Sequence, residues 1–157
     1  MPKYYSIVKW GEKEVKEKVR LDGLYLISQD VIPIFETDSP RIAVSHAKPG
    51  VVIYLTSYHP DLGLVRKLVE KKSYLLFNLT DLLTAPPGSK RQRLMFNMSK
   101  LLTLCIKYKV NYVFSYYTDD PYLMRSLKES VALLSLLGLK EEQVKLGFHI
   151  IEDRLYW

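Results

Sequence analysis

The second half of the chain alternates between amphipathic helical stretches and short β-rich runs, and this alternation constrains the fold more than any other feature. From residue 57 onward the order is helix, strand, helix, strand, helix, strand. Residues 61–72 carry apolar side chains at helical spacing, whereas residues 73–79 form one short apolar run. Strands separated by helices pair in parallel, because a parallel crossover needs about a dozen residues or more. The sequence therefore predicts an α/β fold.

The first half contributes further β-rich runs, at residues 5–10, 23–28, 42–47 and 51–57. A polar helix is expected at residues 11–19, a loop at residues 30–41 and a last strand at residues 145–151. The linker Lys48–Gly50 is too short for a parallel crossover, so the runs beside it form either a hairpin or one bent strand.

With the runs at residues 73–79 and 110–116, the total is about seven strands. We expect one domain, residues 1–157, folded as a small or incomplete TIM-barrel-like (β/α) barrel. An open, doubly wound α/β sheet is the alternative.

A stretch with no carboxylate and many cations separates Asp81 from Asp119. Its six cations are Lys90, Arg91, Arg93, Lys100, Lys107 and Lys109. Ser89 is expected to cap a long helix here, and Gln92 completes a capping box. Such a run is usually the solvated face of a helix, and this interpretation stays open.

Position on the expected helix separates these cations. Lys90, Arg93 and Lys100 face solvent on a helical wheel, whereas Arg91 lies on the apolar face in the first turn and should lean over the end of the core. Lys and Arg in a first helical turn oppose the helix dipole unless an anion is nearby. Backbone amides at a helix start also favour phosphate. The run therefore indicates contact with an anionic partner.

The strand at residues 110–116 ends beside hydroxyl groups and another cation. Ser115 lies near its carboxyl end, and Arg125 follows in the next helix. Loops after the strands of an α/β barrel open on one face, so both residues are expected to converge with the cations of the long helix. Hydroxyl, aromatic and guanidinium groups around a groove suit a nucleic-acid backbone. Arg125 has an alternative partner in Asp119 or Glu129.

The histidines and the cysteine give little support to a catalytic role. His46, His59 and His149 have none of the close spacing seen in the two- or three-metal sites of phosphoesterases. A single-metal site using His46 and His59, which both follow predicted strands, is the alternative to two loop positions, and His149 is expected in the core. Cys105 lies on the apolar helix face and is expected to pack there. We expect no catalytic residue, metal or other cofactor in this chain.

Composition sets wider limits. The net charge of +6 and the pI of about 9.3 agree with an acidic partner without demanding one. The single cysteine fits a reducing cytoplasm, and few Asn, Gln and Cys residues hint at a thermophile. The start of the chain lacks the apolar region of a secretion signal.

A series of short motifs runs from residue 65 to residue 144, about half of the chain. In order they are Thr80–Leu83 after a strand, Arg91-x-Arg93 opening a helix, Lys107–Val110, a strand ending at Ser115, Leu123–Ser126 and Leu133–Leu139. Their order and spacing resemble the ribonuclease P protein component 3 family, the thirty-kilodalton subunit shared by archaea and eukaryotes.

This resemblance implies a TIM-barrel-like fold and membership of an endoribonuclease whose catalytic centre lies in RNA and which removes 5′ leaders from precursor tRNA. It implies ribonuclease P RNA, precursor tRNA and other protein subunits as partners, among them protein component 2, in a heterotetramer of two copies of each. Arg91, Arg93, Ser115 and Arg125 match the family positions best, and Lys90 and Lys100 join them on charge alone.

The chain also departs from the family pattern. Residues 1–60 match poorly, and the family has a longer N-terminal half, which indicates a truncated barrel. Tyr116 follows Ser115 where a second serine is common. Two other functions stay open: a barrel-type metal-dependent phosphoesterase, and a general RNA or protein adaptor.

Overall fold

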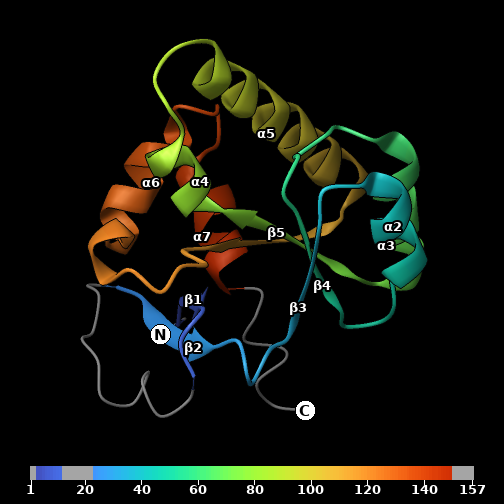
Figure 1. The fold of residues 1–157 in the computed structure, drawn as a ribbon, viewed down its shortest axis with the longest axis horizontal. Helices are drawn as coiled ribbons and strands as arrows, with labels where there is room; N and C mark the ends of the chain where they lie inside the picture. Colours follow the sequence, from blue (N-terminus) through green and yellow to red (C-terminus); the bar gives the residue numbers. More distant parts are fainter. Residues whose placement is uncertain (1–2, 12–22, 150–157) are drawn as a thin grey trace.

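The computed structural model describes residues 3–11 and 23–149, and its larger sheet is parallel throughout (Figure 1). Its strands are adjacent in chain order: β3 (Ile34–Thr37), β4 (Val52–Leu55), β5 (Tyr74–Asn78) and β6 (Asn111–Ser115). Every residue of β4 and β5 is buried, as expected for parallel strands covered on both faces. The α/β prediction is therefore confirmed.

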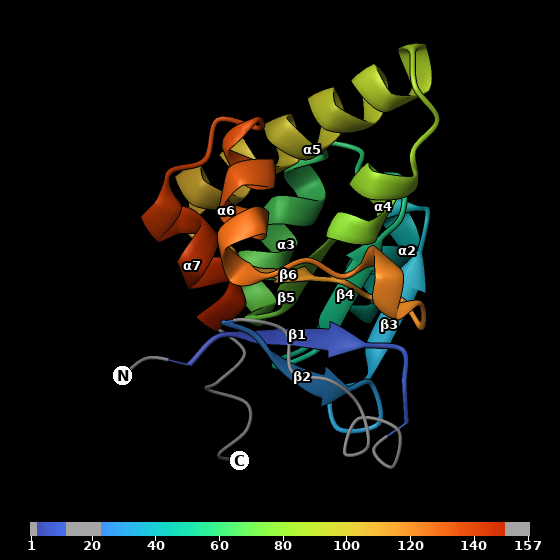
Figure 2. The ribbon, with the colours of Figure 1, turned by 90° about the vertical axis from the view of Figure 1, so that its left-hand side faces the viewer.

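Two further strands, β1 (Tyr5–Val8) and β2 (Tyr25–Ser28), form a separate parallel pair beside β6 (Figure 2). The backbone amide of Lys9 donates to the Thr118 carbonyl at 3.2 Å, which ties the end of β1 to the segment after β6. The described residues agree with an open α/β arrangement, and closure into a barrel stays a prediction. The helix expected at residues 11–19 lies outside the described residues, apart from its first position.

Helices connect the strands of the larger sheet, and they are α2 (Pro40–His46), α3 (Leu62–Lys71), α4 (Leu79–Thr84) and α5 (Ser89–Tyr108). The Asp61 carboxylate caps α3 by accepting from the Leu64 amide at 2.7 Å. α3 packs against α2 and α5. Its predicted inward side chains are buried at Leu64, Val65 and Leu68, whereas Val69 is exposed.

The expected loop at residues 30–41 and strand at residues 42–47 are both wrong. β3 lies inside the former, and most of the latter belongs to α2, because Ser39 Oγ accepts from the Ile42 amide and Pro40 opens the helix. With α2 as a crossover, the short linker Lys48–Gly50 is no longer a difficulty.

The predicted last strand is also wrong where the structure describes it, since residues 145–149 end helix α7 (Glu141–His149). α7 packs on β6, and Gly147 sits so close to the Phe114 ring that an added Cβ would overlap it. Before α7 come a short 3₁₀ helix, η1 (Pro121–Leu123), and α6 (Leu127–Ser135). No helix of the described part has the length and hydropathy needed to cross a bilayer.

Candidate functional site

The carboxyl ends of β4, β5 and β6 meet at one edge of the sheet, where open α/β proteins place their ligands. The chain leaves this edge through residues 56–61 after β4, α4 after β5 and residues 116–120 after β6. In Figure 2, α4 and η1 both stand at this edge, toward the right of the view. We call it the carboxyl edge.

A hydrogen-bonded cluster that the sequence did not predict lies at the carboxyl edge. Oδ2 of Asp81, in α4, accepts from the hydroxyl of Tyr54 at 2.5 Å and from the hydroxyl of Tyr58 at 2.7 Å. Both tyrosines are buried, and Asp81 is half-buried. Together with Asn78 these residues form what we call the tyrosine–aspartate cluster.

Burial, and next the Asp81 carboxylate, raise the pKa of Tyr54. The pKa of Tyr58 is raised for the same two reasons. Both hydroxyls therefore stay protonated and donate to the carboxylate. Tyr58 also has a φ of 51°, a conformation that is unusual for a bulky side chain and costs about 1–3 kcal/mol. Its hydroxyl contacts offset that cost.

Asn78 joins the cluster to the neighbouring strand connection. Its Oδ1 accepts from the amides of Thr80 at 3.1 Å and Tyr117 at 3.0 Å. Its Nδ2 donates to the Tyr54 hydroxyl at 3.3 Å and to the Tyr117 carbonyl at 3.2 Å. Both the donor and the acceptor ends of this buried amide are thus occupied by the protein itself. The cluster holds the carboxyl edge together and leaves little capacity for a ligand.

The cluster reaches the surface through Tyr117. Its hydroxyl donates to Gln29 Oε1 at 2.8 Å, and the Lys9 ammonium lies 5.0 Å from its ring centroid. Burial, and then the charge of Glu36, raise the pKa of Tyr117. A cation, an amide and a phenol therefore meet where β1 and β2 approach the larger sheet.

Ser115 does not line an open surface. It is fully buried, and its hydroxyl donates to the Ile7 carbonyl in β1. The next residue, Tyr116, is also buried, and its amide donates to Ser6 Oγ at 2.9 Å. The expectation that Ser115 belongs to an exposed binding surface is not supported by this position; the side chain joins the two sheets.

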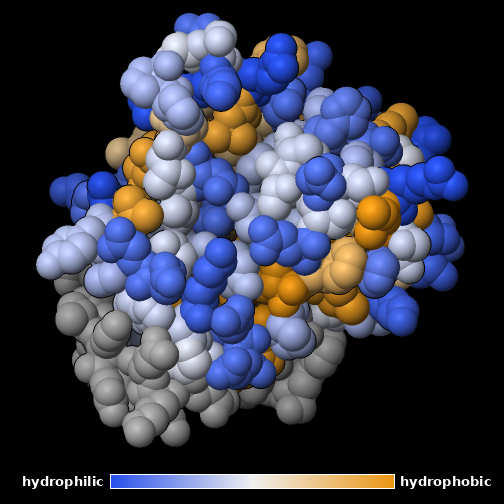
Figure 3. Space-filling view, in the orientation of Figure 1, coloured by the Kyte–Doolittle hydropathy of each residue, from blue (hydrophilic) through white to orange (hydrophobic). Residues whose placement is uncertain are grey.

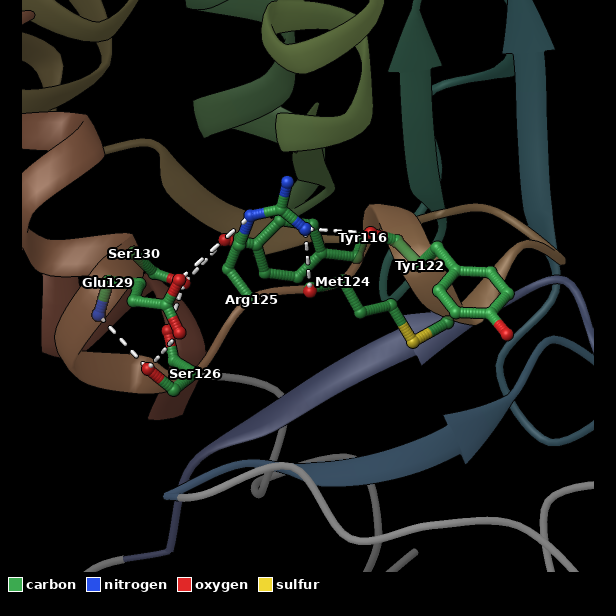
Figure 4. Close-up of polar contacts among 7 residues, drawn as sticks. All are labelled: Tyr116, Tyr122, Met124, Arg125, Ser126, Glu129 and Ser130. Carbon is green, nitrogen blue, oxygen red and sulfur yellow. Dashed lines mark hydrogen bonds and ion pairs between the residues drawn. The ribbon is translucent and has the colours of Figure 1, made fainter.

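Arg125 lies at the carboxyl edge but is engaged with its own segment (Figure 4). Its Nη1 donates to the carbonyls of Tyr122 at 2.8 Å and Met124 at 3.0 Å. Its Nε is 3.9 Å from the Glu129 carboxylate, the i+4 partner that the sequence offered as an alternative. Arg125 therefore shapes the turn between η1 and α6. Beside it, Tyr122 is 87% exposed, which is the most accessible aromatic surface in the described residues.

Arg91 leans over the end of the core as predicted. Its Nε and Nη2 donate to the carbonyl of Ala85 at 3.1 and 2.6 Å, so it closes the turn between α4 and α5. Arg91 and Arg125 thus follow two neighbouring strands of the larger sheet, β5 and β6.

Lys90 and Arg93 are exposed in the first turns of α5, and neither has an ion pair within the part of the chain that the structure describes. The predicted cap at Ser89 is wrong. Gly88 is the cap residue, it has a φ of 103°, and no side chain bonds to the first amides. An uncapped helix start with unpaired cations is electropositive and favours an anion.

Lys100 lies apart from these cations. It is ten residues beyond Lys90, or about 15 Å along a helix axis. Its ammonium lies 4.7 Å from the ring centroid of Phe96, and Pro60 and Thr103 are neighbours in a shallow pocket. The structure therefore separates Lys100 from the other predicted site residues.

Among residues 3–11 and 23–149, no group of three His, Cys, Asp or Glu side chains is placed to hold a metal ion. His46 ends α2 instead of following a strand, and its ring stacks on Phe35 with centroids 3.9 Å apart. His59 is exposed after β4, and His149 Nδ1 bonds to the Lys3 carbonyl at 2.8 Å. Cys105 is buried as predicted, and burial raises its pKa to about 12.

A scan of protein-family models and a search of curated proteins found no match to this chain. A search of solved structures found a chain in the cryo-EM structure of an archaeal ribonuclease P with mature tRNA. The match has a TM-score of 0.72 and 15% sequence identity, and it covers 97% of this chain and 91% of that chain. At this identity the likeness establishes a shared fold. Its coverage reaches well beyond the stretch from residue 65 to residue 144 that carries the motifs.

Proposed function

We propose that this chain is a protein subunit of ribonuclease P. The observation that carries the proposal is the likeness of fold over nearly the whole chain to a component of an archaeal ribonuclease P. The series of motifs from Thr80 to Leu139 supports it independently, because motifs were matched by residue type and order, without reference to the fold.

The motifs favour protein component 3 among the subunits, with a TIM-barrel-like fold that the described strands begin to build. Its partners are then ribonuclease P RNA, precursor tRNA and protein component 2. In this role the chain supports cleavage by the RNA and supplies no catalytic group of its own. A cytoplasmic location follows from the same assignment.

The side chains at the carboxyl edge divide into two sets under this proposal. Arg91 and Arg125 bind backbone carbonyls and keep the turns after β5 and β6 in shape. Lys90 and Arg93 have no partner of their own in the described structure, so they are the groups most available to RNA phosphates or to carboxylates of another subunit.

Reconstitution of precursor-tRNA cleavage, with the cognate RNA and the other subunits, tests the proposal. Adding the chain should raise the cleavage rate. The Lys90→Ala/Arg93→Ala double variant should lose most of that gain, and the single variants Arg91→Ala and Arg125→Ala should lose part of it. Lys107→Ala, an exposed cation in the last turn of the same helix, is the matched control and should leave the gain intact.

Three results would contradict the assignment. No stimulation by the wild-type chain would exclude a role in this assembly. Metal-dependent phosphatase activity of the chain alone, abolished by His46→Ala or His59→Ala, would favour the phosphoesterase alternative. Equal binding to unrelated RNAs would point instead to a general adaptor.

A further inference from the structure

A groove of about 280 Å³ lies between α4, the first turns of α5 and the end of α6. Arg91 stands in its wall, and the rest of its lining is apolar: Leu82, Leu83, Met95, Leu133, Leu136 and Leu137. Binding sites are usually concave and lined mainly by apolar side chains with a few polar groups, and this groove has that character.

The walls of this groove are fixed by hydrogen bonds. Arg91 holds α5 to the end of α4 through the Ala85 carbonyl. Ser99 Oγ, one turn beyond Met95 on α5, donates to the Leu137 carbonyl at 3.2 Å and ties α5 to the end of α6. The groove is therefore pre-formed, and a ligand would not have to order it.

The open side of the groove is hydrophobic at Leu136, which is 70% exposed at the end of α6. Figure 3 shows an orange, hydrophobic patch directly below the blue start of α5. Part of the apolar surface thus remains in contact with water in the isolated chain.

The wall that α5 forms is positive. Arg91 faces the groove and Lys90 precedes it in the same turn, α5 has no acidic residue in its first turn, and no side chain caps its first amides. The amides of Leu136, Leu137 and Gly138 donate to carbonyls in the last turn of α6, so these carbonyls need no donor from a partner. The positive wall of the groove instead favours a partner with carboxylates, and the apolar lining favours one with apolar side chains.

We infer that this groove docks an acidic amphipathic helix of a partner protein. A helix inserts apolar side chains at i, i+3 and i+7 into such a groove and places its carboxylates beside Arg91 and the neighbouring Lys90. RNA fits less well, because its phosphates gain nothing from six apolar side chains and the lining has no aromatic ring for a base to stack on. The inference deepens the proposed function, since it takes the partner to be another subunit of the same assembly, but its test does not depend on that function.

The direct test uses a fluorescent synthetic peptide of about 18 residues, five helical turns, with leucines on one face and glutamates on the other. Its counterpart carries lysine in place of every glutamate. We expect the intact chain to bind the acidic peptide about tenfold more tightly, or 1.4 kcal/mol, as measured by fluorescence anisotropy.

Leu136→Glu should weaken binding of the acidic peptide by about tenfold or more, and Lys90→Glu, next to Arg91, should also weaken it. The control is Leu146→Glu, at an exposed leucine of α7 that does not line the groove. This variant has the same net charge as Leu136→Glu, so any general attraction between a basic chain and an acidic peptide is equal in both. Circular dichroism confirms that each variant is folded before binding is measured.

Three results would overturn the inference: no preference for the acidic peptide, equal weakening by Leu136→Glu and Leu146→Glu, or binding of a single-stranded RNA oligonucleotide that Leu136→Glu alone abolishes. In the reconstituted assembly, Leu136→Glu should lower the cleavage gain while Leu146→Glu does not. If the peptide binds as expected but the wild-type chain never stimulates cleavage, the proposed function fails and the docking groove stands.

Discussion

The tyrosine–aspartate cluster lies at the carboxyl edge and the first turn of α5 lies beyond α4 (Figure 2), and the polar groups of the two regions differ in their partners. In the cluster, buried hydroxyl and amide groups find partners within the protein, and the side chain of Asn78 alone connects to three other residues. In the first turn of α5, Lys90 and Arg93 are exposed, and the helix start has no side-chain cap. The cluster gives the edge its shape, and the helix start presents charge to whatever binds there.

Alkaline pH should produce the largest effect on stability. It acts on the buried tyrosines, which include the two of the tyrosine–aspartate cluster. Burial raises the pKa of Tyr112 and Tyr116 to about 12, and the pKa of Tyr54 and Tyr58 moves in the same direction. In the unfolded chain a tyrosine ionises at about pH 10. Folding therefore favours the neutral form of each buried tyrosine. The contribution of these groups to the free energy of unfolding is complete below about pH 10 and is lost as pH rises toward 12.

Urea unfolding at a series of pH values measures that loss, and tyrosinate absorbance should rise together with it. The Tyr54→Phe/Tyr58→Phe variant should show a shallower decline above about pH 10, because two of the ionising groups are gone. Reversible ionisation of these tyrosines with the native fold retained would contradict the description of the cluster as closed.

Asn78→Ala should lower the free energy of unfolding by about 3 kcal/mol, because it leaves the buried amides of Thr80 and Tyr117 without their acceptor. Asn97→Ala, on the half-buried part of α5, is the control and should change it by about 0.5 kcal/mol or less. Similar losses in the two variants would mean that Asn78 contributes no more to stability than a half-buried polar side chain outside the cluster. Urea denaturation followed by circular dichroism makes the measurement.

Arg91→Ala tests the turn between α4, which carries Asp81 of the cluster, and the start of α5. The Ala85 carbonyl would lose both guanidinium donors, but water can reach this half-buried turn, so we expect a loss of about 1 kcal/mol. Arg93→Ala, two residues away and exposed, should leave stability unchanged. A loss with Arg93→Ala as large as with Arg91→Ala would show that the second cation is also structural.

Lys90→Glu should give the smallest change, and its sign is the informative part. A carboxylate in the first turn interacts favourably with the helix dipole, so stability should rise by about 0.3–0.5 kcal/mol. Lys107→Glu, in the last turn of the same helix, should lower stability by a similar amount. If Lys90→Glu instead destabilises the chain, Lys90 has an internal partner and is not reserved for binding.

The sequence predicted the elements whose pattern agrees with their packing. α3 and α5 carry apolar faces at helical spacing, and β4, β5 and β6 are short apolar runs between them, so both kinds of element were recognised. Arg91 was placed correctly because a cation inside an apolar face, in a first turn, can only fold back over the helix end. No pattern along the chain shows which polar groups will meet in space, and Tyr54, Asn78 and Asp81 were missed for that reason.

The errors have identifiable causes. Residues 42–47 read as a strand because Ile42 and Val44 alternate with small residues. The local signals that select the helix, the Ser39 cap and Pro40, had been assigned to a loop. The end of α7 was assigned to a strand because Gly147 lowers helix propensity, yet the contact with Phe114 leaves no space for a side chain there. A signal for the tyrosine–aspartate cluster did exist: Asn78 and Asp81 directly follow a buried strand, the position where α/β folds gather polar groups.

The hydroxyl of Ser115 reaches back to Ile7 across 108 positions of the chain, and this has a consequence for biosynthesis. β1 emerges from the ribosome early, but the residues that hold it against the larger sheet follow roughly 5–20 s later at usual translation rates. During that interval β1 has only β2 to pair with. The nascent N-terminal segment therefore has an unprotected strand edge, and a chaperone that shields it should increase the yield of folded chain.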